Sequence, residues 1–173
     1  MSNFVIYSGI IIFDPENKTK KHDIQAEWKR TAMVLIDGEI CEYYQWFINK
    51  RYNLQLNKPL RNAHISFIND RFSDVNNNTG TEEEKIILWD SVKEKYNNKE
   101  INVVLDLDVR ANKNHWWLNI PEEYRVELHN IRTELGLARP FYGLHMSIGY
   151  TNDRNKDHSN YILDMINKGI ITS

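Results

Sequence analysis

Two short segments of this 173-residue chain repeat the same pattern around a histidine. One covers residues 58–67 and the other residues 139–148, so that His64 and His145 lie 81 positions apart. Each copy has a basic residue, a proline and an apolar residue, then the histidine, then a serine two positions later. A single His-x-Ser is usually structural, but two copies in matching contexts indicate a paired functional site.

The spacing has a direct meaning if each copy lies on a β-strand. Side chains alternate between the two faces of a strand, so His64 and Ser66 would project together, as would His145 and Ser147. The positions between and after them are apolar and would face the core. The proline five residues before each histidine favours an extended approach to the strand. Each copy therefore presents an imidazole and a hydroxyl on one face.

Two facing imidazoles can catalyse phosphoryl transfer without a metal. One neutral histidine accepts a proton from the attacking oxygen, and the other, protonated, donates one to the leaving oxygen. The hydroxyls of Ser66 and Ser147 would stabilise the charge that grows on the non-bridging phosphate oxygens. The sequence leaves open which histidine is the base. We expect no metal and no other cofactor, because Asp106 and Asp108 fit a solvated strand face and a single cysteine excludes a cysteine cluster.

Hydrophobic periodicity predicts an α+β domain with a mainly antiparallel sheet. The expected strands cover residues 4–13, 31–36, 63–68, 101–109, 115–119 and 144–150. The expected helices cover residues 39–52, 81–96, 121–135 and 158–167. Loops are predicted for residues 17–25 and 73–80, and the second is expected to be mobile because it is the most polar stretch of the chain.

Charge and hydropathy restrict the possible partners. The net charge is −2 and no long basic block occurs, so long nucleic acid is not expected as a ligand. No segment has the roughly 20 apolar residues that cross a bilayer, so no membrane association is expected. The first residues do not resemble a signal peptide, which favours a cytoplasmic location. The sequence leaves the oligomeric state open.

The paired motifs resemble the signature of the 2H phosphoesterase superfamily, in which two His-x-Ser/Thr motifs lie about 80 residues apart. The resemblance extends over residues 4–170 and implies one 2H phosphoesterase-like domain over residues 1–173. It implies a bilobal α+β fold with two pseudo-symmetric lobes, whose antiparallel strands line a central groove. It also implies catalytic roles for His64, Ser66, His145 and Ser147. Threonine is frequent at the two hydroxyl positions of the family, whereas both are serine here.

Residues 140–149 and 158–162 look like the phage anti-CBASS branch of that superfamily. This resemblance implies a metal-independent enzyme that opens 3′–5′ bonds of cyclic di- and trinucleotide messengers in the host bacterial cytoplasm. One alternative is a 2H enzyme that acts on RNA ends or on 2′,5′-oligoadenylate. Another is a module that sequesters a nucleotide without cleaving it, although such a module would not need both histidines and both serines.

A small nucleotide substrate would be bound largely by stacking on aromatic side chains. The candidates are Tyr7, Trp117 and Tyr142, although packing in the core is the more common role for any single aromatic residue. Strand alternation places Trp117 and its neighbour Trp116 on opposite faces, so at most one can reach the groove.

Two arginines lie close to the motifs in the sequence and are candidates for contact with phosphates. These residues are Arg61 and Arg139. A surface charge at the beginning of a strand is the alternative role for each.

Overall fold

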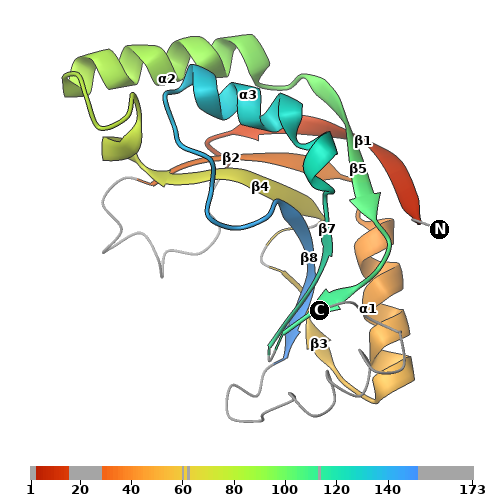
Figure 1. Cartoon of the computed structure of the whole chain (residues 1–173). Coiled ribbons are helices and arrows are strands. Elements are labelled where there is room, and N and C mark those ends of the chain that lie inside the picture. The colour runs from red at the N-terminus through yellow and green to blue at the C-terminus, as the bar shows by residue number, and fades with distance from the viewer. Residues whose placement is uncertain (1–2, 16–28, 60, 62, 113, 152–173) are drawn as a thin grey trace.

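The computed structural model of the chain describes residues 3–15, 29–59, 61, 63–112 and 114–151. In this part of the chain eight strands form a single curled sheet, a half-barrel (Figure 1). The strands are β1 (Phe4–Phe13), β2 (Lys29–Ile36), β3 (Leu56–Asn57), β4 (His64–Arg71), β5 (Glu100–Asp106), β6 (Arg110–Ala111), β7 (His115–Asn119) and β8 (His145–Thr151). Their order is β5-β1-β2-β4-β8-β7-β6, with β3 paired to β8, and every pair is antiparallel. The predicted α+β class with a mainly antiparallel sheet is confirmed.

Three helices pack against this sheet within the described residues, and each contacts a different part of it. They are α1 (Glu39–Tyr52), α2 (Glu82–Tyr96) and α3 (Val126–Glu134). Helix α1 lies beside β3 and β8, whereas α2 contacts β1 and α3 contacts β4 (Figure 1). Helix α2 begins at the predicted capping box, in which Thr81 and Glu84 each bond the backbone N–H of the other. No helix among the described residues is long and apolar enough to span a bilayer.

The apolar core follows from strand alternation. In β1 the buried positions are Gly9, Ile11 and Phe13, with exposed or half-buried residues between them. The same alternation in β7 buries Trp116 and Leu118. Because one face of each strand is apolar, the sheet has one register that buries all of these side chains together.

Strands β3 and β6 were not predicted, and several predicted boundaries differ from the observed ones, among them those of α3 and β5. The helix expected over residues 121–135 is a 3₁₀ turn, Glu122–Tyr124, followed by α3. The strand expected over residues 101–109 ends at Asp106, because its carboxylate accepts a hydrogen bond from the Asp108 N–H and turns the backbone. The loop expected over residues 17–25 and the helix expected over residues 158–167 lie outside the described residues.

Residues 73–80 form an ordered turn that is bonded to the end of α3. The N–H groups of Asn76 and Asn77 donate to the carbonyls of Leu135 and Gly136, at 2.8 and 2.9 Å. Gly136 has φ +64°, and a Cβ there would lie 2.7 Å from the Asn76 Cα. The predicted helix end at Gly136 is confirmed to within two residues, and the close backbone contact explains why the polar segment is held in place.

Replacing Gly136 with alanine should lower the free energy of unfolding by at least about 2 kcal/mol. The left-handed backbone costs a non-glycine residue roughly 1–2 kcal/mol, and the overlap with the Asn76 backbone adds to it. Gly80→Ala is the matched control, since φ is +80° there but the nearest atoms belong to side chains that can move. Urea denaturation of both variants measures the difference, and equal losses would contradict the argument from backbone overlap.

Candidate active site

The two histidine motifs lie on neighbouring strands in the middle of the sheet. Strand β4 begins at His64 and β8 begins at His145, and the two strands pair with Ile65 opposite Met146. Ile65 and Met146 are fully buried in the core. The histidines and serines beside them therefore project from the opposite face, as strand alternation requires.

Antiparallel pairing relates the two motifs by an approximate twofold axis. With Ile65 opposite Met146, the next residues outward are His64 facing Ser147, and Ser66 facing His145. The two histidines are then diagonal neighbours across the pair, a relation in which side chains lie roughly 7–8 Å apart at their bases. All four motif side chains are half-buried. The structure thus brings together the four residues that the repeat predicts as catalytic.

Helix α1 holds the back of β8. The buried Gln45 amide donates to the Ile148 carbonyl at 2.7 Å, and the Cys41 thiol lies 3.5 Å from the same oxygen. Burial raises the pKa of Cys41 to about 11, so its thiol stays protonated and can act as a weak donor. These contacts attach α1 to strand β8. The side of β8 that carries His145 faces the cavity described below.

The imidazole of His145 is held in one tautomer. Its Nδ1 lies 2.8 Å from the Gly143 carbonyl, which can only accept, so Nδ1 carries the proton. The neutral ring therefore has its free lone pair on Nε2. Burial lowers the pKa of His145, the Gly143 hydrogen bond partly opposes this, and the charge of Arg125 lowers the pKa further. A neutral imidazole with an available Nε2 can act as a general base.

A third histidine, which the sequence analysis did not select, belongs to this cluster. The His115 Nε2 lies 2.8 Å from the Ser147 hydroxyl. Its ring stacks between Tyr150, with centroids 4.7 Å apart, and Trp117, with centroids 5.0 Å apart. The His145 ring is 5.4 Å away. Strand β7 places these groups here, because it pairs with β8 along the motif.

The His115 imidazole is neutral in this environment. Burial, with a smaller contribution from His145, lowers its pKa to about 4. Ser147 also lies 3.3 Å from the Tyr150 hydroxyl, where either oxygen can be the donor. If His115 and Tyr150 both donate to the Ser147 oxygen, the hydroxyl proton of Ser147 remains available for a ligand. The alternation of His115, Trp117 and Asn119 is the signal in the sequence that could have identified this residue.

A cavity of 370 Å³ adjoins His145 and His115. That volume lies within the range of about 300–1,000 Å³ that is usual for small-molecule sites. Its described lining residues are the two histidines together with Arg110, Asn112, Trp117, Asn119, Arg125, Tyr142 and Gly143. No carboxylate is present in this described lining, so the cavity favours an anionic ligand.

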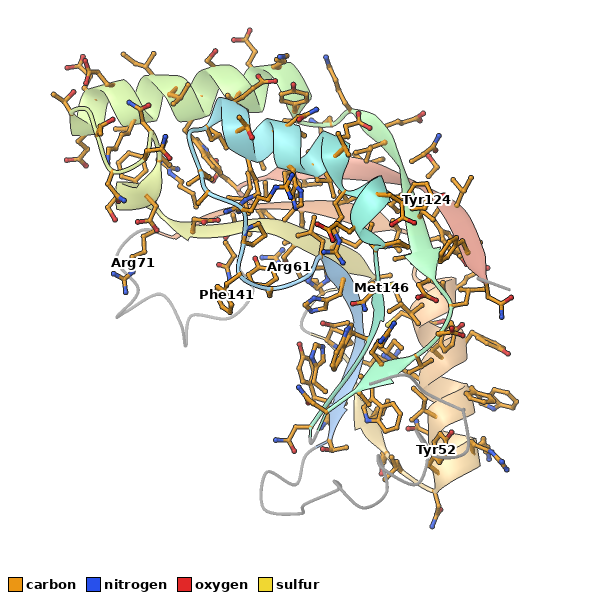
Figure 2. The ribbon with its side chains drawn as sticks, in the orientation of Figure 1. Tyr52, Arg61, Arg71, Tyr124, Phe141 and Met146 are labelled. Atoms are coloured by element: carbon orange, nitrogen blue, oxygen red, sulfur yellow. The ribbon has the colours of Figure 1, made fainter. Side chains whose placement is uncertain are left out.

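Two of the five predicted substrate-binding residues line this cavity. Trp117 and Tyr142 both do so, and their rings lie 6.1 and 6.3 Å from the His145 ring. Trp116 faces the core, stacked on Tyr52 with 5.9 Å between centroids, so the prediction that the two tryptophans face opposite sides is confirmed (Figure 2 labels Tyr52).

The other three predicted substrate-binding residues are not in the lining of this cavity. Tyr7 packs against the core, and its pKa is raised by burial and then by the charges of Asp37 and Glu39. Arg61 lines a separate cavity of 80 Å³ that is formed with α1. Arg139 is exposed and lies 3.8 Å from a Glu122 oxygen. For Arg61 and Arg139, proximity to the motifs in the sequence did not predict their positions in the structure.

Phe141, in the second motif, is not in the described lining of this cavity. It is fully exposed and contacts Tyr142 edge-on, with 5.2 Å between ring centroids (Figure 2 labels Phe141). Among the described residues no three His, Cys, Asp or Glu side chains come together in an arrangement that could hold a metal ion.

Comparison of the chain with protein-family models, with curated proteins and with solved structures found no match.

Proposed function

We propose that this protein is a phosphodiesterase that uses His64 and His145 as an acid–base pair without a metal. The observation that carries the proposal is the pairing of β4 with β8, which places two identical His-x-Ser motifs side by side on one face of the sheet. A binding module would need neither this symmetry nor two imidazoles and two hydroxyls. The half-barrel is compatible with the two pseudo-symmetric lobes of the 2H phosphoesterase superfamily, whose signature the motifs resemble.

The tautomer of His145 supports its assignment as the general base. In the proposed reaction a ribose 2′-OH transfers its proton to the His145 Nε2, and its oxygen forms a bond to phosphorus. The bond between phosphorus and the 5′ oxygen breaks, and the protonated His64 donates its proton to that oxygen. The product carries a 2′,3′-cyclic phosphate at one end and a 5′-hydroxyl at the other. Ser66 and Ser147 donate hydrogen bonds to the non-bridging oxygens as charge develops.

The proposed substrates are cyclic di- and trinucleotides, and the proposed setting is a bacterial cytoplasm during phage infection. The resemblance of residues 140–149 to the anti-CBASS branch supports this choice. So does the cavity beside His145, which has aromatic walls, two arginines and no carboxylate in its described lining. Its volume of 370 Å³ fits a compact ligand better than a long polymer.

The experiment that tests the proposal is incubation of the purified protein, in EDTA, with cyclic di- and trinucleotides and with linear 3′–5′ and 2′–5′ oligoadenylates. Liquid chromatography separates the isomeric products, and tandem mass spectrometry identifies them. We expect ring opening to a linear product of unchanged mass, because intramolecular attack adds no water. Cleavage of linear substrates alone would favour the alternative enzyme acting on RNA ends or 2′,5′-oligoadenylate. A nucleotide recovered intact but bound would favour the sequestering module, and loss of turnover in EDTA would contradict the metal-free mechanism.

A further inference from the structure

Four side chains that line the cavity beside His145 offer hydrogen-bond donors, two arginines and two asparagines, whereas the His145 Nε2 is an acceptor. The Asn119 Oδ1 accepts from the Trp117 indole N–H at 3.0 Å, so the amide NH₂ is the group left for a ligand. The Asn112 Oδ1 accepts from the backbone N–H groups of Asn114 and His115, at 3.2 and 2.9 Å. The Asn112 oxygen thus uses both of its acceptor positions and the Asn119 oxygen uses one of two, while each amide keeps its NH₂ group for a ligand.

Arg125 adds a charged donor next to His145. Its Nε donates to the Ile120 carbonyl at 2.6 Å, which fixes the guanidinium in place. A Cβ at position 143 would lie 3.2 Å from the Arg125 Nη2, so Gly143 leaves room for this close approach. Arg125 forms no ion pair with a carboxylate in the described part of the chain. Burial lowers the pKa of Arg125, and the charges of Glu122 and Glu123 oppose this shift.

The cavity thus has two chemically different ends. Arg125 and Asn119 lie beside His145, where a phosphate would be placed for reaction. Asn112 lies beside His115, since its N–H donates to the His115 carbonyl at 2.9 Å. Trp117 lies on the strand between these two ends, and because His115 stacks on one side of its ring, a base would stack on the other side.

We propose that this cavity is a nucleotide subsite that prefers guanine to adenine, with Arg125 bound to the phosphate. Guanine presents two acceptors, O6 and N7, on one edge, whereas adenine presents an acceptor and the N6 donor. Asparagine recognises adenine with both its amide oxygen and its NH₂, and the Asn112 oxygen already accepts two backbone hydrogen bonds. Arg110, which lines the cavity with a guanidinium nitrogen 3.9 Å from an Asp106 carboxylate oxygen, adds a further donor suited to guanine. The inference rests on the proposed function only in taking the ligand to be a nucleotide.

Calorimetric titration of the full chain with guanosine and adenosine 5′-monophosphates tests this preference without requiring turnover. We expect the guanine nucleotide to bind about tenfold more tightly. Arg125→Gln should weaken both nucleotides by a similar factor and leave their ratio unchanged. Equal binding of the two nucleotides by the unmodified protein would overturn the inference, and an Arg125→Gln variant with unchanged affinities would remove Arg125 from the site.

The most specific test is Asn112→Asp. The aspartate keeps the oxygen that accepts from the two backbone N–H groups and replaces the NH₂ by a second acceptor, so the preference for guanine should disappear. Asn119→Asp makes the same exchange at the phosphate end while keeping the bond to Trp117, and it should weaken both nucleotides without changing their ratio. Asn102→Asp, at an exposed position of β5, controls for the added charge. An unchanged ratio in a folded Asn112→Asp variant would overturn the inference.

The two proposals fail in different ways. Selective binding of the guanine nucleotide with no cleavage of any oligonucleotide would contradict the phosphodiesterase function and support the subsite. Cleavage of cyclic nucleotides by a protein that binds both mononucleotides equally would support the phosphodiesterase function and overturn the guanine preference.

Discussion

Replacing His145 with alanine is expected to reduce turnover of the cleaved nucleotide by about 10²–10⁴-fold, and replacing His64 by a similar factor. Each variant removes one proton-transfer group while leaving the buried apolar residues of its strand in place. His129→Ala is the matched control, because His129 is also half-buried but lies on α3 and is not in the described cavity lining. Initial rates of turnover measure the effect, and circular dichroism checks that each variant is folded. A near-normal rate in either motif variant would contradict the acid–base pair.

The dependence of kcat/KM on pH reports the ionisation of His145. A general base must be unprotonated, and the pKa of His145 is lowered from its usual value of 6.5. We therefore expect kcat/KM to fall as the pH drops through a value below 6.5. A kcat/KM that does not change with pH below 6.5 would contradict a role for His145 in proton transfer. Arg125→Gln should move the acidic limb to higher pH, because the Arg125 charge is one cause of the lowered pKa.

Replacing Arg132 with methionine is expected to lower the free energy of unfolding by about 3–5 kcal/mol. Its guanidinium is 2% exposed and forms a bidentate pair with Asp70, at 2.7 and 3.0 Å. It also donates to the carbonyls of Phe67 and Ala138. Methionine fills much of the space but leaves the Asp70 carboxylate and two carbonyls without their donor.

This pair matters for the site because it joins three segments around it. Arg132 lies on α3, Asp70 lies on the strand that carries His64, and Ala138 precedes the second motif. At about 2–4 °C per kcal/mol for a chain of this size, the expected fall in Tm is roughly 6–20 °C.

Arg139→Met is the control for this substitution. Arg139 is exposed and pairs with Glu122 only at 3.8 Å, so its removal should cost less than about 1 kcal/mol. Urea unfolding compares the two variants. Equal losses would show that the Arg132 network contributes no more than a surface ion pair.

The amino-acid pattern alone predicted most elements and the two histidine motifs. Alternation and capping signals placed β1, β2, β4, β7, β8, α1 and α2 within a few residues of their observed bounds. The repeat around His64 and His145 identified four residues that lie together in the structure. These features depend on two local rules, the two-residue period of a strand and the need of a helix end for hydrogen-bond partners. They can therefore be predicted from the sequence.

Tertiary structure decided the neighbours of the motifs. His115 lies 30 residues before His145, and only the pairing of β7 with β8 brings it to Ser147. Arg125 reaches the cavity because the turn at Gly143 passes beneath its guanidinium. In contrast, Arg61 and Arg139 are close to the motifs in sequence but do not line the cavity beside His145. Strand order and register arise from the packing of the whole core, and no local pattern encodes them.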